Sequence, residues 1–224
     1  MTPQFNTTFE MIAHFHELAE HDKAELAGEL HDDLGGFLIG AVMDLSMLAP
    51  RIATLGKDAQ EKMGRIRQSL GSAIELTRRI TEQLRPTLLD NVGLFAAVRW
   101  QLKNACARNN VACTDTLPVS EPQLTARASI ALFRSTQEAL FVGIERPEVT
   151  RLDLCGSMDD TALSLRITGD GRGLSDNASE ITNLVLESIR HRIRALGGAV
   201  TLRNRSQGGI VLALTAPLAN VVAH

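Results

Sequence analysis

Aromatic residues are scarce in this chain of 224 residues, which has no tyrosine, one tryptophan and seven phenylalanines. Proteins that bind single-stranded nucleic acid need aromatic faces on which the bases can stack. The formal net charge is −3, and the 23 basic residues are scattered along the chain. A basic patch of the kind that binds nucleic acid is therefore missing as well, and we expect no nucleic-acid partner.

Cysteine is also scarce, with only Cys106, Cys113 and Cys155 at wide spacing. An odd number so spaced is typical of reduced thiols in a cytosolic protein and indicates neither a disulfide framework nor a zinc site. The N-terminal segment carries acids and histidines, unlike a signal peptide. Since no run approaches the roughly 18 apolar residues that cross a bilayer, we expect a cytoplasmic protein without membrane insertion.

Two long amphipathic helices are predicted in the first part of the chain. Apolar residues recur at steps of three and four over residues 26–48, and again over residues 63–84, which is the spacing of one helix face. Pro50 and Gly56 interrupt the pattern between them. Because a two-helix hairpin cannot enclose a core alone, we expect a second copy to complete a homodimeric four-helix bundle. Packing on the rest of the same chain is the alternative.

The remainder of the chain predicts a different architecture. Helices are expected over residues 94–108, 124–144 and 181–196, and strands near residues 111–116, 152–154, 163–167, 199–203 and 209–215. Helices on one face of a mostly antiparallel sheet form an α/β sandwich. The predicted fold class is therefore α+β, with an N-terminal helical extension (1–21), a hairpin domain (22–88) and a sandwich domain (89–224).

A histidine with an adjacent acid stands out on the first helix. His31 lies one step from the apolar seam, on the solvent flank, and Asp32 follows it directly. A neutral imidazole is a nucleophile when one nitrogen is free, and a carboxylate can fix its tautomer and accept its proton. Surface histidines are commonly inert, so this pair alone is weak evidence for catalysis.

Five segments in series resemble the conserved boxes of two-component histidine kinases of the nitrate-sensor and desaturase-regulator type. They are AELAGELHDDLGGFL, LRPTLLDNVGLFAAVRWQL, LFRSTQEAL, ITGDGRGL and RIRALGGAVTLRNRSQGGIVLALTAPL, and they run in the family's order from about Asp22 to Pro217. The resemblance implies a dimerisation and phosphoacceptor domain followed by an ATPase-like domain of the GHKL type.

The resemblance also implies roles for particular residues. His31 would be the phosphoacceptor and Asp32 its general base. In the nucleotide site, Glu138 matches the acid of the family's N-box. The box that recognises adenine is matched by Asp170, Gly171 and Gly173. Without this context, the sequence DGRG would indicate an ordinary turn after a strand. ATP and magnesium are the cofactors that the resemblance implies.

Two departures from the family pattern concern the nucleotide site. Val142 stands where the family has an asparagine that holds magnesium, and valine has no oxygen to offer a hard cation. No glycine occurs over residues 175–189, where the family has a second glycine-rich box. Arg146 keeps a basic residue at the end of the N-box. We therefore expect weak or absent binding of ATP and magnesium, and we assign no metal ligands.

Three functions follow from these observations. The favoured one is a histidine phosphotransferase that carries a phosphoryl group on His31 to or from response-regulator receiver domains. The alternative is an ATP-dependent kinase that autophosphorylates His31 with another oxygen ligand, such as Glu138 or Glu145. A non-catalytic dimeric scaffold is the second alternative. An upstream kinase or sensor protein is a further expected partner, and residues 5–18 are amphipathic enough to dock one.

Overall fold

The computed structural model describes residues 18–121, 123–174 and 180–223. The chain divides into two units, residues 1–87 and 88–224, and each is described by itself. Residues 18–21 of the predicted N-terminal extension are helical. The rest of that extension, and with it residues 5–17 of the docking segment predicted over residues 5–18, lie outside the described residues.

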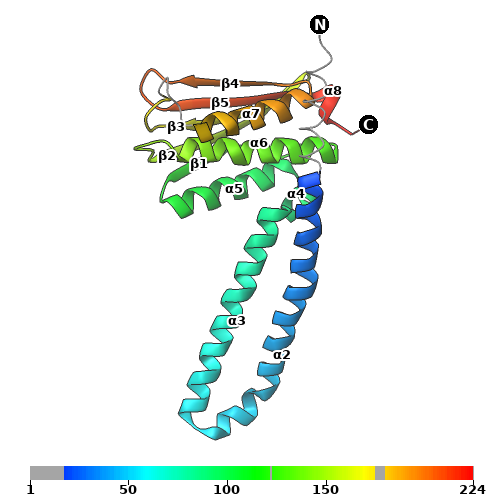
Figure 1. Cartoon of the computed structure of the whole chain (residues 1–224), viewed down its shortest axis with the longest axis vertical. Helices are drawn as coiled ribbons and strands as arrows, with labels where there is room; N and C mark the ends of the chain where they lie inside the picture. The colour runs from blue at the N-terminus through cyan, green and yellow to red at the C-terminus, as the bar shows by residue number, and fades with distance from the viewer. Residues whose placement is uncertain (1–17, 122, 175–179, 224) are drawn as a thin grey trace. The chain divides into compact units, whose positions relative to one another are not determined.

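The first unit is a helical hairpin (Figure 1). Helix runs from residue 18 to residue 29 and continues through a π-helical turn, η1 (Leu30–Leu34), into α2 (Gly35–Ile52) and a short 3-10 turn, η2 (Ala53–Leu55). The second arm is α3 (Lys57–Leu84), which packs along α2. The fold prediction of a long N-terminal hairpin is confirmed.

The expected interruption at Pro50 was wrong, because α2 continues through this proline to Ile52. Pro50 removes one backbone donor and with it the helical bond to the Ser46 carbonyl, but it lies in the last turn, so the helix ends soon after it and need not continue beyond a kink. The reversal of the chain occurs instead at Gly56, which has a φ of +95°. Glycine adopts this left-handed region without a steric penalty.

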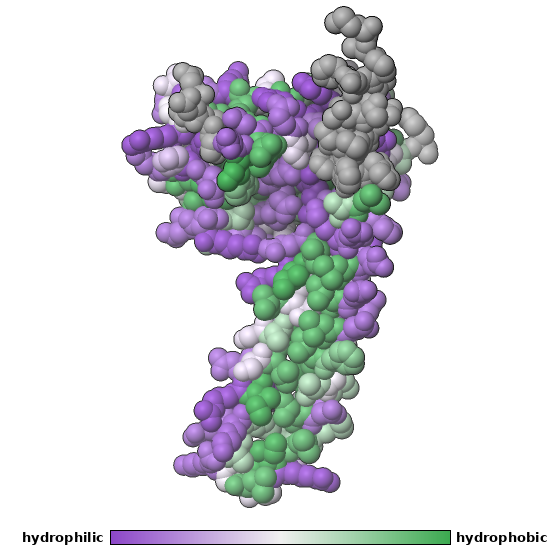
Figure 2. All heavy atoms as spheres, in the orientation of Figure 1, coloured by the Kyte–Doolittle hydropathy of each residue, from purple (hydrophilic) through white to green (hydrophobic). Residues whose placement is uncertain are grey.

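One face of α2 contacts α3, and much of the remaining surface is apolar and uncovered. Half-buried side chains recur at steps of four and three in α2, namely Leu38, Val42, Leu45, Ala49 and Ile52. No residue of η1 or α2 is buried. Phe37 is 75% exposed, Met47 70% and Met43 62%. Figure 2 shows the resulting hydrophobic band along the hairpin.

The helical run Leu18–Leu55 is long and apolar enough, by length and composition, to cross a membrane. Its best 18-residue window has a mean hydropathy of 1.4, and none of that window is buried. The prediction that no apolar run approaches the length needed to cross a bilayer was therefore wrong. One such helix is weak evidence for a membrane, since the seam helix of a bundle carries the same apolar residues.

The second unit is a five-stranded sheet with helices on one face (Figure 1). Its elements, in chain order, are α4 (Thr87–Asn91), α5 (Leu94–Asn109), β1 (Ala112–Thr116), α6 (Ala126–Ile144), β2 (Arg151–Met158), β3 (Ala162–Gly169), α7 (Glu180–Ala195), β4 (Ala199–Asn204), β5 (Ile210–Pro217) and α8 (Leu218–Val221). The strand order is β1-β2-β3-β5-β4, in which only β1 and β2 pair in parallel.

The core of this unit lies between the sheet and its helices. Alternate residues of β3 face it, and Leu163, Leu165 and Ile167 are each 0% exposed. Strand β5 alternates in the same way, as expected for strands with one covered face. The predicted α+β sandwich is confirmed. Leu152 pairs with Gly169 in the register of β2 and β3, so the loops flanking this pair lie together.

Candidate phosphoacceptor and nucleotide sites

His31 and Asp32 lie in the π-helical turn η1, and both side chains are exposed. A π-turn inserts one extra residue into a helix and is frequent at functional sites. Within the described part of the chain, neither side chain makes a recorded hydrogen bond. The structure therefore leaves the imidazole open to solvent, and Asp32 forms no hydrogen bond with it among the described residues. Sequence reasoning missed this irregular turn, which two glycines, Gly35 and Gly36, follow directly.

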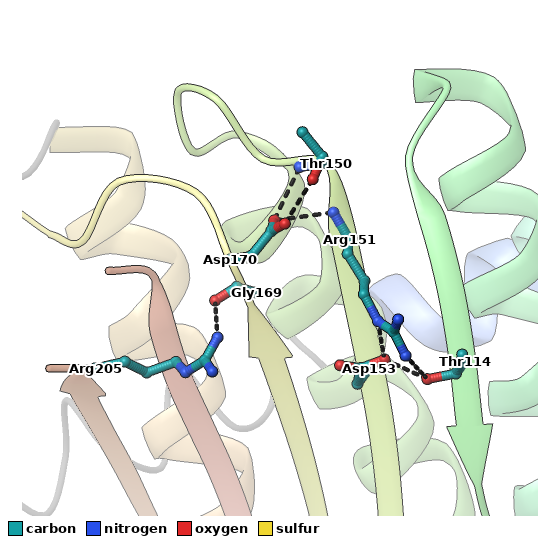
Figure 3. Close-up of polar contacts among 7 residues, drawn as sticks. All are labelled: Thr114, Thr150, Arg151, Asp153, Gly169, Asp170 and Arg205. Atoms are coloured by element: carbon teal, nitrogen blue, oxygen red, sulfur yellow. Dashed lines mark hydrogen bonds and ion pairs between the residues drawn. The ribbon is translucent and has the colours of Figure 1, made fainter. Parts of the chain in front are cut away.

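Asp170 follows β3 directly and is held by the start of β2 (Figure 3). Its Oδ1 accepts hydrogen bonds from the backbone N–H groups of Thr150 and Arg151, each at 2.9 Å, and its Oδ2 accepts one from Thr150 Oγ1 at 2.6 Å. Burial alone would raise the pKa of this carboxyl, but the hydrogen bonds from Thr150 and Arg151 hold it below its ordinary value. The carboxylate is therefore ionised and oriented.

Gly171 and Gly173 allow the backbone of this loop to approach other segments closely. A Cβ on Gly171 would lie 2.7 Å from the carbonyl oxygen of Pro147, and one on Gly173 would lie 2.8 Å from Asn204 Oδ1. The backbone N–H of Arg172 donates to that same Pro147 oxygen at 2.9 Å. Sequence reasoning missed Asn204, which fastens the end of β4 to this loop.

Glu138 lies on α6 and faces α7. Arg192 Nη1 lies 2.7 Å from Glu138 Oε2, and Ser188 Oγ donates to Glu138 Oε1 at 3.4 Å. The Arg192 and Glu138 side chains are only 15% and 27% exposed, so this ion pair is partly shielded from water. Sequence reasoning missed both partners, although their separation of four residues places them on one helix face.

Val142 lies in the last turn of α6, and Arg146 follows the C-cap of this helix. The Val142 side chain is buried, 1% exposed, and offers no oxygen. Arg146 Nε donates to the carbonyl oxygen of Val142 at 3.1 Å, and its Nη2 donates to Thr182 Oγ1, on α7, at 3.0 Å.

This donor set does not fit magnesium. Glu138, the one carboxylate within α6, is bound by an arginine, and Glu145, which caps the helix, is exposed. Over the described ranges, no group of three or more His, Cys, Asp or Glu side chains is arranged to hold a metal ion. A hard cation needs several oxygen ligands, and this part of the site supplies positive charge instead.

Comparisons with known proteins point to one family. Residues 22–89 match the family model described as histidine kinase. The chain is 28% identical over 202 residues to the sensor histidine kinase MctS of Rhizobium johnstonii, a match that covers 88% of this chain and 43% of that protein. It is 29% identical over 188 residues to the kinase/phosphatase UhpB of Salmonella typhimurium, covering 83% and 37%. The chain thus spans less than half the length of either relative.

Among solved structures, the fold is similar to that of the histidine kinase domain from the blue-light activated kinase of Erythrobacter litoralis. The TM-score is 0.53, with 12% identity over 89% of this chain and 94% of that chain. At this identity the likeness concerns the fold. Because it covers 89% of this chain, it includes parts of both units.

Proposed function

The chain belongs to the histidine kinase family of two-component signalling, and from this premise we propose that it carries a phosphoryl group on His31. The observation behind the proposal is the exposure of the His31 imidazole on the hairpin, where no recorded contact among the described residues restrains it. A phosphoacceptor must be reached from outside its own domain, and an exposed ring in an irregular turn permits this.

We propose that the hairpin works as a homodimer. Phe37, Met43 and Met47 lie exposed on one helix, and a large exposed apolar patch commonly marks a protein–protein interface. The same band on a second copy of the hairpin would pack against it. The two bands together would form the core of a four-helix bundle. The apolar character of the run Leu18–Leu55 then belongs to a bundle seam, and we propose a cytoplasmic location for the chain.

ATP is the phosphoryl donor that the relatives favour, since one of them is named a sensor histidine kinase and another a kinase/phosphatase. In this reaction an imidazole nitrogen of His31 bonds to the γ-phosphorus, the bond to the β–γ bridging oxygen breaks, and ADP leaves. The imidazole proton passes to a base, for which Asp32 is the adjacent candidate. A response-regulator receiver domain is the proposed recipient of the phosphoryl group.

A second candidate function is a relay in which an aspartyl-phosphate receiver, or an upstream kinase, supplies the phosphoryl group. The observation that favours it is the buried Val142 beside a Glu138 already bound by Arg192. In phosphoryl transfer from ATP, metal ions supply much of the charge neutralisation, and these side chains do not offer a metal ligand. A receiver domain would bring its own acidic pocket.

The test is to incubate the full chain with γ-labelled ATP and Mg²⁺ and, in parallel, with a phosphorylated receiver domain. His31→Gln is the variant, and His21→Gln, another exposed histidine of the same helical run, is the matched control. Label from ATP that is lost only in His31→Gln supports the kinase. Label only from the receiver supports the relay, and no label from either donor contradicts the proposal.

A further inference from the structure

Two of the three cysteines lie together where helix α5 meets strand β1. Cys106 lies in the last turn of α5, and its carbonyl oxygen accepts a hydrogen bond from the backbone N–H of Val111 at 3.0 Å. Asn110, which has a φ of +54°, reverses the chain between the two elements, and asparagine adopts this left-handed conformation more readily than most residues. Strand β1 therefore starts against the last turn of the helix, and Cys113 is its second residue.

The side chains of these two cysteines face one another. Strand β1 alternates, with Cys113 and Asp115 half-buried and the other residues of the strand exposed. Cys113 thus points to the helix-covered side of the sheet, where it packs against the core that contains Cys106. Cys106 is 1% exposed, and the two thiols form a hydrogen bond. A disulfide requires its two sulfurs to be brought to bonding distance, and this contact places them close to it.

The two thiols differ in protonation and in access. Burial raises the pKa of the Cys106 thiol to about 12, and the neighbouring Cys113 adds to this rise, so Cys106 stays protonated at neutral pH. Cys113 is half-buried on β1, which is an edge strand of the sheet. A small oxidant that enters from this edge therefore meets the Cys113 sulfur before the Cys106 sulfur.

The third cysteine, Cys155, provides a contrast within the same sheet. It is exposed on β2 and pairs across the ladder with Arg166 of β3, which is exposed as well. Both side chains project from the face of the sheet opposite to the buried residues of these strands. The chain has three cysteines in all, and the other two lie on the covered face. Cys155 is therefore a single thiol, whereas Cys106 and Cys113 form a pair.

We infer that Cys106 and Cys113 are a redox-active dithiol, which a hydroperoxide converts to an intramolecular disulfide that joins α5 to β1. The thiols are the resting state, as expected for a reducing compartment. The inference goes beyond the proposed phosphoryl transfer and does not depend on it, because it uses neither His31 nor the nucleotide loop.

The reaction takes two steps. The Cys113 sulfur attacks one oxygen of hydrogen peroxide, the O–O bond breaks, and a sulfenic acid and one water result. The Cys106 sulfur then attacks the Cys113 sulfur, the S–O bond breaks, and the hydroxide leaves as water with the Cys106 proton. The contact between the two sulfurs favours this second step, although Cys106 is protonated, because the attack is intramolecular. Overall two thiols lose two electrons and two protons, and the peroxide is reduced to two waters.

The disulfide should stabilise the sandwich. It would close a short loop and tie an edge strand, which pairs with β2 on one side, to the helix that covers it. A cross-link of this kind lowers the entropy of the unfolded chain. We expect the thermal midpoint of the sandwich to rise by several degrees on oxidation and to return when a dithiol reductant is added.

The experiment treats the reduced full chain with hydrogen peroxide, alkylates the remaining thiols and identifies the tryptic peptides by mass spectrometry. We expect the peptides that contain Cys106 and Cys113 to be linked, with the loss of two hydrogens, and dithiothreitol to separate them. Cys155→Ser is the matched control, which should form the same linkage and show the same rise in the thermal midpoint. Cys113→Ser should show neither, and its Cys106 should stay reduced.

Cys106→Ala tests the order of the two steps. Without the second thiol, Cys113 should stop at the sulfenic acid, which dimedone traps. Absence of the linkage between Cys106 and Cys113 at a peroxide concentration that oxidises Cys155 would overturn the inference, as would a linkage that forms only in urea. His31→Gln should form the same disulfide, so a failure of phosphorylation at His31 remains distinguishable from a failure of this inference.

Discussion

The hairpin and the sandwich contain similar apolar residues, but the sandwich buries them and the hairpin leaves many of them exposed. In β3, Leu163, Leu165 and Ile167 are completely buried within one chain. In α2 no side chain is buried, and Phe37 is 75% exposed. The sandwich therefore completes its own core, whereas the described part of the hairpin leaves an apolar face uncovered. The proposed homodimer would cover this face, so we expect the stability of the hairpin to depend on association.

The largest expected effect is on the self-contained core. Leu165→Ala removes a completely buried side chain from the centre of β3 and should lower the free energy of unfolding of the sandwich by about 2–5 kcal/mol. Urea denaturation followed by circular dichroism measures this loss. Ser157→Ala, at an exposed site of the neighbouring strand, should change it by less than about 0.5 kcal/mol. Equal effects of the two substitutions would contradict this description of the core.

A charge in the uncovered band should act on association instead. Phe37→Glu, at a site that is 75% exposed in the single chain, should weaken self-association at least tenfold and leave unfolding of the sandwich unchanged. Sedimentation equilibrium measures the association, with Gln68→Glu at an exposed polar site of α3 as control. If Phe37→Glu associates like the control, another surface makes the dimer.

Replacing the Asp170 carboxylate should have a smaller effect on stability, and this effect should depend on pH. Its pKa in the folded chain lies below the ordinary value of 3.8, so the stability it contributes is complete above that value and is lost as the pH falls through the folded pKa. Asp170→Asn should cost about 1 kcal/mol near neutral pH, the net value of about one hydrogen bond. Thermal melts of both proteins at several pH values should show the difference shrinking below pH 3.8, and a constant difference would exclude the carboxylate as its source.

The smallest effect concerns an exposed ion pair of the hairpin. Lys62 Nζ lies 3.1 Å from Asp58 Oδ2, with the side chains 63% and 81% exposed. Asp58→Asn should change the free energy of unfolding by at most about 0.5 kcal/mol. Adding salt should reduce even this difference. A difference well above about 0.5 kcal/mol that persists at high salt, seen in denaturation curves, would mean that the substitution acts through something other than this ion pair.

Most of the fold was predicted from the spacing of apolar residues along the chain. The steps of three and four over residues 26–48 and 63–84 predicted both arms of the hairpin, and alternation at Leu163, Leu165 and Ile167 predicted β3. Pro50 was misread because the effect of a proline depends on its distance from the helix end. The parallel pairing of β1 with β2 was not predicted, since strand direction is decided by long-range contacts.

The candidate sites were predictable only in part. Sequence patterns singled out His31, Glu138 and Asp170, but their chemical surroundings come from residues far along the chain. Thr150 lies 20 positions before Asp170, and Arg192 lies 54 positions after Glu138. No local spacing rule reaches so far, because these contacts are set by the register of β2 on β3 and by the packing of α7 on α6.

The most direct test of the account is to locate the phosphoryl group on the chain. After incubation of the full chain with ATP, and separately with a phosphorylated receiver domain, mass spectrometry of peptides kept at neutral or alkaline pH identifies the modified residue. The account predicts phosphate on His31 from at least one donor and its absence in His31→Gln. A chain that takes no phosphate from either donor, or carries it on another residue, would contradict the account.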